Sequence, residues 1–407
     1  MLRAWLCCGL CATLLCASSP VFAEGALSAE ASAEPSTGSG VSTSASASST
    51  SEPPGLTAVS EEEAQAAFEP GALPFLFAWI PGVLLHGSGV YAAGDEDAGW
   101  RLLALEGAGL GAAIAGALSL WATRASRRTV GPIVAVTVSG FGLFVSTWLA
   151  DLVGSAGLGE SGVVPRQRYL AELRTGYQYV YDPLFEHHSF WGLEGALRLS
   201  AWHLSARLLA ALHLDEQLYA LHTGWRFFGP LGKQASADGS YLDFDLGVTH
   251  HRNGADGFSV LGIEGALQGR LDFGLLGRSL RATFMELGLG WGLQFYAYPE
   301  LDLALGTDSV DTLLARFRFG TVLGEWRQGQ LELGFYYDHR RDTLAGGVGL
   351  NDISSGSMGF FGLDAALALP SDEDGDSWTV HTKVEIGSAL IAAFGLGYAW
   401  SAREAAP

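Results

Sequence analysis

The most constraining feature of this chain is a repeat of two in residue character that runs through residues 168–401. Successive side chains of a β-strand point to opposite faces, so this repeat predicts strands. In the first expected strand, Tyr169 and Leu173 lie on one face, and Glu172 and Arg174 lie on the other. We expect about twelve such strands.

The charges of this region all fall on one side of the alternation. The apolar faces carry no Asp, Glu, Lys or Arg, and a membrane barrel turns such faces toward lipid. A soluble sandwich or periplasmic binding barrel would instead hide them inside, and that alternative stays open here. We expect the ionised side chains to line a lumen; they are Glu172, Arg174, Glu194, Arg198, Arg207, Arg226, Asp243, Asp245, Glu264, Arg270, Glu286, Arg316, Arg318, Glu332, Asp338, Asp364, Lys383 and Glu385.

The last expected strand supports a membrane location. Its Gly395, Tyr398 and Trp400 resemble the C-terminal assembly signal of Gram-negative outer-membrane β-barrel proteins. The resemblance implies outer-membrane lipid as surroundings and the barrel assembly machinery as a partner in transit. The predicted fold class is therefore mainly β, a C-terminal antiparallel transmembrane β-barrel of about twelve strands at residues 168–401, preceded by a small apolar α-helical module.

Residues 1–23 have the pattern of a signal peptide, with an apolar run too short to span a bilayer as a helix and small residues before Ala23. A lipoprotein signal using Cys11 or Cys16 is the alternative, although a Leu precedes each. All four cysteines lie in this segment, so a cleaved chain would carry no thiol for disulfides or metal binding.

Three further segments precede the barrel. Residues 24–68 are rich in Ser, Ala and Thr and predict a disordered periplasmic linker. Residues 69–155 predict an apolar helical module rich in Gly and Ala, and 156–167 a second linker. The module holds three stretches of membrane-helix length, namely Pro74–Ala92, Trp100–Thr123 and Val130–Val153. Its small residues favour close packing of helices, whether the module lies in lipid, in the lumen or in the periplasm.

The segment Ile80–Gly94 contains Pro81, Gly82 and, further on, Gly87-Ser-Gly-Val-Tyr91. It resembles the Pro-Gly-x-Gly-x-x-Tyr-x-Gly turn of small two-helix membrane domains. The resemblance implies close packing and no chemistry. The formal charge of −20 argues against nucleic acid as a partner, because phosphate binding needs a basic surface.

One string suggests chemistry. Thr249–Gly254 resembles the His-x-Ser-Asn-Gly stretch of the outer-membrane phospholipase family, with His250 at the histidine position and Asn253 following in place. Arg252 stands where that family has its nucleophilic serine, and an acyl-enzyme needs a hydroxyl beside the base. A polar hairpin loop is the alternative interpretation.

A second string, Asp372, Asp374 and Asp376, offers carboxylates at alternate positions, as calcium loops do. It lacks the distal glutamate of such a loop, and a solvated turn explains it equally. The other histidines show no metal-ligand spacing and are interpreted as lumen or interface residues. We expect no cofactor.

These observations predict a non-enzymatic outer-membrane barrel with a periplasmic N-terminal segment. It would act as a small passive channel or have a structural or assembly role. The alternatives are an outer-membrane lipid hydrolase and a soluble periplasmic binding barrel. The transported solute and the oligomeric state do not follow from the sequence.

Overall fold

The structure is a computed structural model that describes residues 68–124, 126, 129–158, 169–182, 186–230, 239–254, 257–298, 307–324, 329–339, 348–349, 357–371, 376–387 and 389–401. The predicted signal peptide and nearly all of both predicted linkers lie outside these residues.

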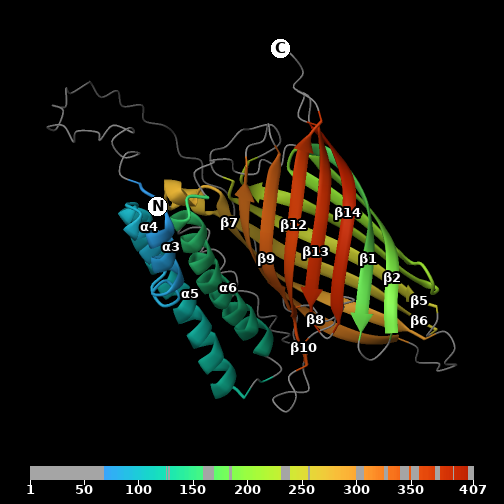
Figure 1. Cartoon of the computed structure of the whole chain (residues 1–407). Coiled ribbons are helices and arrows are strands. Elements are labelled where there is room, and N and C mark those ends of the chain that lie inside the picture. The colour runs from blue at the N-terminus through green and yellow to red at the C-terminus, as the bar shows by residue number, and fades with distance from the viewer. Residues whose placement is uncertain are drawn as a thin grey trace, which may run out of the picture. The chain divides into compact units, whose positions relative to one another are not determined.

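Twelve antiparallel strands close into one barrel (Figure 1). They are β1 (Tyr169–Asp182), β2 (Glu186–Leu199), β3 (Trp202–Ala211), β4 (Glu216–Phe228), β5 (Tyr241–Asn253), β6 (Phe258–Asp272), β7 (Thr283–Ala297), β8 (Thr307–Leu323), β9 (Gln330–Asp338), β12 (Phe360–Pro370), β13 (Ser377–Ile386) and β14 (Leu390–Ser401). A separate two-stranded hairpin joins β10 (Val348–Gly349) to β11 (Ser357–Met358). The predicted fold class is confirmed.

The barrel closes because β1 pairs with both β2 and β14. Tyr169 lies opposite Ser401, so the first and last strands begin and end together. We call this the terminal end of the barrel and the opposite end the far end. Closure leaves no unpaired strand edge, which a sheet in lipid cannot tolerate.

The outer surface of the barrel is apolar and uncovered over most of its circumference. Phe227, Leu363 and Trp378 are 62%, 60% and 57% exposed. A soluble barrel would bury such side chains, whereas a bilayer solvates them. One expectation fails, since Tyr169 lines the lumen and not the outer face. The strand register shifts between Tyr169 and Ala171, which turns Tyr169 to the other side.

The helical module contains α3 (Ala72–Trp79), α4 (Ser88–Ala92), α5 (Glu96–Ala122) and α6 (Val130–Ser155). The expectation of one membrane-length helix over Pro74–Ala92 is wrong, because the chain turns between α3 and α4. Pro81 has no N–H to donate, and Gly87 has the left-handed φ of +90° that favours glycine. A side chain at Gly82 would collide with the carbonyl of Ala78.

α5 and α6 form an antiparallel pair whose small residues let the backbones meet. A Cβ added at Gly109 would lie 2.9 Å from the Gly140 carbonyl oxygen. Both helices are long and apolar enough to cross a membrane. The composition of the module therefore serves close helix packing, as expected.

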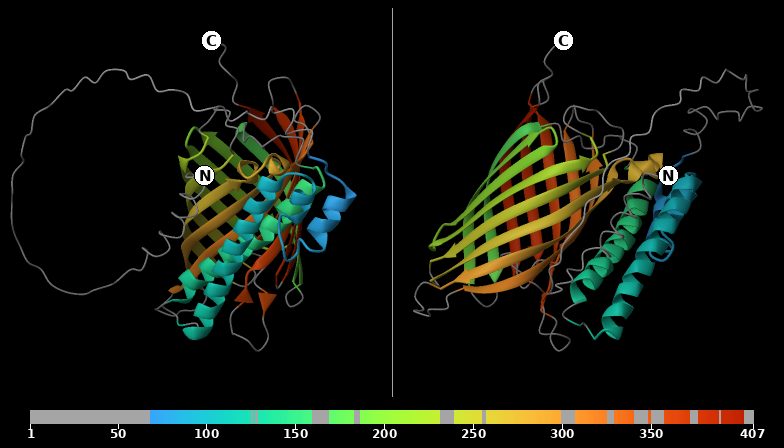
Figure 2. Two further views of the ribbon diagram at one scale, coloured as in Figure 1. Left: turned by 90° about the vertical axis from the view of Figure 1, so that its left-hand side faces the viewer. Right: turned by 180° about the vertical axis from the view of Figure 1, so that it is seen from behind.

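α6 packs against the outer wall of β7 and β8 (Figures 1 and 2). The rings of Phe141 and Phe317 meet edge to face at 6.1 Å, and Gly142 lies directly over the Phe317 ring. As a result Phe317 and Phe319 are 0% and 5% exposed, unlike outward residues elsewhere. The described helices thus lie outside the lumen, against the apolar outer face of the barrel.

Near the terminal end, the β6–β7 connection holds two short 3-10 helices, η1 (Phe273–Leu275) and η2 (Arg278–Leu280). Ser279 Oγ donates to Asp95 Oδ2 at 2.8 Å, and Arg101 Nη1 donates to the Leu276 carbonyl oxygen at 2.7 Å. Leu280 lies in an apolar cluster with Leu102 and Ala150. These contacts fasten the start of α5 to the barrel.

Candidate functional site

The interior of the barrel holds a cavity of about 950 Å³ lined by residues from all twelve barrel strands. Tyr169 and Gln330 line it near the terminal end, and Phe258 and Tyr296 line it near the far end. The cavity therefore follows most of the barrel's length, and its lining is the candidate functional site.

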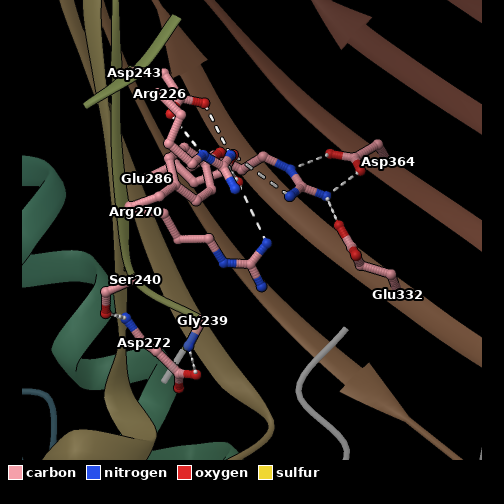
Figure 3. Close-up of polar contacts among 11 residues, drawn as sticks. Arg226, Gly239, Ser240, Asp243, Arg270, Asp272, Glu286, Glu332 and Asp364 are labelled. Carbon is pink, nitrogen blue, oxygen red and sulfur yellow. Dashed lines mark hydrogen bonds and ion pairs between the residues drawn. The ribbon is translucent and has the colours of Figure 1, made fainter. Parts of the chain in front are cut away.

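An arginine network occupies one part of this lumen (Figure 3). Arg318 Nη2 donates to Asp364 Oδ2 at 2.6 Å and to Glu332 Oε1 at 2.7 Å. Its Nη1 lies 3.7 Å from Glu286 Oε2. Arg270 Nη1 approaches Glu286 Oε1 at 3.6 Å. One arginine thus holds carboxylates from three other strands, β7, β9 and β12, in a single cluster.

Arg226 makes a two-pronged ion pair nearby. Its Nε and Nη2 donate to the two carboxylate oxygens of Asp243 at 2.8 and 2.9 Å (Figure 3). This fork geometry is the strongest arrangement for an arginine and a carboxylate, and both side chains are buried. Tyr241 links this pair to the arginine network, since its ring centre lies 4.2 Å from the Arg226 guanidinium and its hydroxyl donates to Glu286 Oε1 at 3.2 Å.

Several of the remaining lumen charges form simpler pairs. Nitrogen–oxygen distances are 2.9 Å for Arg174 with Glu172, 2.8 Å for Arg207 with Glu194 and 3.1 Å for Lys383 with Glu385. The Arg316 guanidinium lies 5.5 Å from the centre of the Tyr336 ring, and Arg198 is opposite His203 in the strand register. Asp338 is buried at the end of β9. Each of these residues lies on the inner side of its strand.

Inward-facing glycines make ion pairs between alternate strands possible. Arg318 on β8 reaches Asp364 on β12 across Gly334 of β9, and a Cβ at Gly334 would lie 2.7 Å from Arg318 Nε. A larger residue there would separate the charges. The glycines of the lumen therefore determine which charges can meet.

Sequence reasoning assigned no specific role to five histidines that the structure places beside lumen carboxylates. The nitrogen–oxygen distances are 2.7 Å for His203 with Asp245, 3.0 Å for His188 with Glu216, 2.8 Å for His251 with Glu216, and 3.3 Å both for His222 with Glu264 and for His381 with Glu172. Their inward positions in the alternation were the available signal. The sequence could not identify their carboxylate partners, because these lie on other strands.

The residues of the phospholipase-like string are not brought together. His250 and Asn253 are three positions apart on β5 and so point to opposite faces. The His250 ring lies on the outside, 6.4 Å from the Tyr219 ring. Arg252, at the nucleophile position, pairs with Asp215 at 3.0 Å. This arrangement does not favour the hydrolase alternative.

The acidic string has a structural role at its described residue. Asp376 Oδ1 accepts from the Ser401 backbone N–H at 2.7 Å, and Oδ2 accepts from the Tyr398 hydroxyl at 3.2 Å. Asp376 thereby fixes the end of β14, while Asp372 and Asp374 lie outside the described residues. Within the described part of the chain, no group of three or more His, Asp or Glu side chains could hold a metal ion.

A second group of buried polar side chains lies in the helical module. Asp151 accepts from the backbone N–H groups of Val90 and Gly89 at 2.8 and 3.2 Å. Glu106 Oε2 accepts from the His86 backbone N–H at 2.9 Å, and His86 Nδ1 lies 2.7 Å from Thr147 Oγ1. These contacts hold the turn between α3 and α4 against α5 and α6.

The barrel geometry defines the class of this protein. A closed antiparallel barrel with an even number of strands, an apolar exterior and a charged interior is the architecture of bacterial outer-membrane β-barrels. The described part of the chain has this transmembrane β-barrel architecture, with a helical module on its outer wall. No protein-family model matches the chain, and no curated protein matches it either.

Solved structures of outer-membrane barrels resemble the chain at low similarity. The NanC porin has a TM-score of 0.35 and 9% identity, covering 57% of this chain and 100% of its own. The KdgM porin has a TM-score of 0.32 and 9% identity, covering 56% and 99%. The translocator domain of autotransporter NalP from Neisseria meningitidis has a TM-score of 0.34 and 15% identity, covering 62% and 96%. Because these TM-scores are low, the class rests on the barrel geometry alone.

Proposed function

We propose that this protein is a small passive channel of the outer membrane. The observation that supports it is the cavity of about 950 Å³ that follows most of the barrel's length and is lined by charged and polar side chains together with apolar ones such as Leu209, Phe258 and Ile391. The helices that could have filled the lumen pack on the outer wall instead. In this proposal the terminal end and the segment before α3 face the periplasm, and the far end faces the cell exterior.

A structural or assembly role is the second candidate. It is supported by the helical module, which covers Phe317 and Phe319 on the outer wall where a simple channel has no need of a cover. In this role the module would anchor the periplasmic segment to the membrane. Dense ion pairing in the lumen is consistent with this role as well, because it stiffens the barrel wall.

Planar-bilayer recording of the purified protein distinguishes the two candidates. A channel gives discrete steps with ohmic current, and a structural barrel gives none. Two neighbouring residues provide matched variants, since Ala220 lines the cavity while Leu221 faces outward and is 51% exposed. We expect Ala220→Trp to lower the step size and Leu221→Trp to leave it unchanged. Equal steps in both variants, or silence in the unmodified protein, would contradict the channel.

A further inference from the structure

One wall of the lumen carries a series of histidine–carboxylate contacts from β2 to β6. We call the set His203–Asp245, His222–Glu264 and His188–Glu216–His251 the histidine ladder. His188, His203 and His251 side chains are 22% exposed and that of His222 is 36% exposed, so all face space inside the barrel. The carboxylate side chains of Glu216 and Glu264 are less exposed than their histidines, at 5% and 20%, and that of Asp245 is about as exposed as His203, at 23%.

The strand register aligns two of these contacts in rows. His203 lies opposite Gly224, which lies opposite Asp245. His222 lies opposite Gly247, which lies opposite Glu264. In both rows the glycine on the middle strand leaves room for the histidine and the carboxylate to meet above it, and any side chain there would collide with the histidine.

The ladder extends along the lumen wall. On β5, the inward positions run from Asp245 near the terminal end, past Gly247, to His251 near the far end. At the far end, Glu216 is 4% exposed and contacts His251 at 2.8 Å and His188 at 3.0 Å. A solute crossing the lumen therefore passes ladder groups at several depths.

Permanent charges of both signs lie near the ladder. Arg198 lies opposite His203, and the Arg226–Asp243 ion pair occupies the next inward positions of β4 and β5. Arg174, Arg207 and Glu194 line the same recess as His222, and Arg174 pairs with Glu172 at 2.9 Å. Arg207 pairs with Glu194 at 2.8 Å, so it adds little net charge beside His222.

The His188–Glu216–His251 group, near the far end of the barrel, has apolar neighbours. His188 stacks on Phe190, with ring centres 6.3 Å apart, and lies opposite Val180. His251 lies opposite Leu218 and Val260. The net charge of this group therefore depends on Glu216 and on the protonation of His188 and His251. Imidazoles as a class change charge near pH 6.5, while carboxylates stay ionised at that pH.

We propose that the histidine ladder makes this channel selective for small cations at neutral pH and that acidification removes the selectivity. Charged side chains along a narrow pore select ions of opposite sign. With neutral imidazoles, the ladder carboxylates present net negative charge to the lumen. Protonation of the histidines cancels that charge. This inference rests on the proposed channel function.

The test measures the reversal potential of the channel in a gradient of potassium chloride. We expect the permeability ratio of potassium to chloride to exceed one at about pH 7.5 and to fall about threefold or more by about pH 5. The triple variant His203→Gln, His222→Gln, His251→Gln should lose much less of its selectivity in acid than the unmodified protein, because glutamine does not titrate and His188 is the one histidine of the ladder that remains. The matched control is His250→Gln, whose side chain faces outward on the same strand, and it should behave as the unmodified protein.

Each outcome decides the inference. A triple variant that loses selectivity in acid as the unmodified protein does would overturn it, as would selectivity that never depends on pH; the channel itself survives both results. Silence at every pH overturns the channel and this inference together. If the triple variant does not fold, the variant Asp245→Asn, Glu216→Gln is used instead. The proposal then requires weaker cation preference at neutral pH, and unchanged preference rejects it.

Discussion

The buried carboxylates of the helical module and those of the barrel lumen are stabilised in different ways. Asp151 of the module accepts hydrogen bonds from two backbone amides, Gly89 and Val90, at the start of α4. Glu286 of the lumen lies within 3.7 Å of the guanidinium groups of Arg270 and Arg318. The module uses neutral donors, and the lumen uses opposite charges.

The difference follows from where free backbone donors exist. An α-helix satisfies its own N–H groups except in its first turn, so an interrupted helix offers donors inside an apolar environment. The break between α3 and α4 supplies them to Asp151. In a closed barrel the backbone N–H and C=O groups are used in hydrogen bonds between neighbouring strands. Inward carboxylates must therefore find side-chain partners. Three predictions test this comparison.

The largest effect is expected in the lumen. Arg318→Ala would leave Glu286, Glu332 and Asp364 without their shared cation, and removing one partner of a buried ion pair costs about 3–5 kcal/mol. Urea unfolding of the barrel in lipid vesicles measures this loss. Arg252→Ala is the control, since its pair with Asp215 is more than half exposed and contributes at most about 1 kcal/mol. Equal losses in the two variants would show that the lumen network is not the stabilising element.

An intermediate effect is expected in the module. Asp151→Ala removes the acceptor of two buried N–H groups, and leaving buried donors unsatisfied costs about 1–3 kcal/mol. Because the donors are backbone groups of the turn, the loss should appear as faster hydrogen exchange at residues 86–92, with unfolding of the barrel unchanged. Asp97→Ala, at a side chain that is 89% exposed in the same module, should change neither. Destabilisation of the whole barrel by Asp151→Ala would mean that module and barrel unfold as one unit.

The smallest effect is expected where the two regions touch. Gly142→Leu would place a side chain into the Phe317 ring and force α6 away from the wall, at a cost of about 1–3 kcal/mol. Gly107→Leu on α5 is the matched control, because nothing lies within 4 Å of a Cβ there. Protease protection of the α5–α6 pair in vesicles should fall in the first variant alone. Equal protection in both would show that the module does not depend on the close contact with β8.

Sequence alone determined the barrel and the sides of its strands. Alternation separates the two faces without any knowledge of strand partners, because each strand's side-chain direction is a local property. The sequence predicted the lumen residues from Glu172 to Glu385 in this way. Tyr169 was misplaced because a shift of one position in register reverses every assignment beyond it, and nothing local marks that shift.

Only the tertiary structure decided which charges meet and where the module lies. Asp245 and His203 are 42 positions apart and meet because β3 and β5 flank a glycine of β4. Asp151 and Val90 are 61 positions apart and meet because α6 returns beside α4. The alternation of residue types in the sequence describes one strand or helix at a time. Which side chains meet depends on the register between strands and on how helices pack, and both are set by the whole fold. For the same reason the sequence could not predict that the helices pack on the outer wall of β7 and β8.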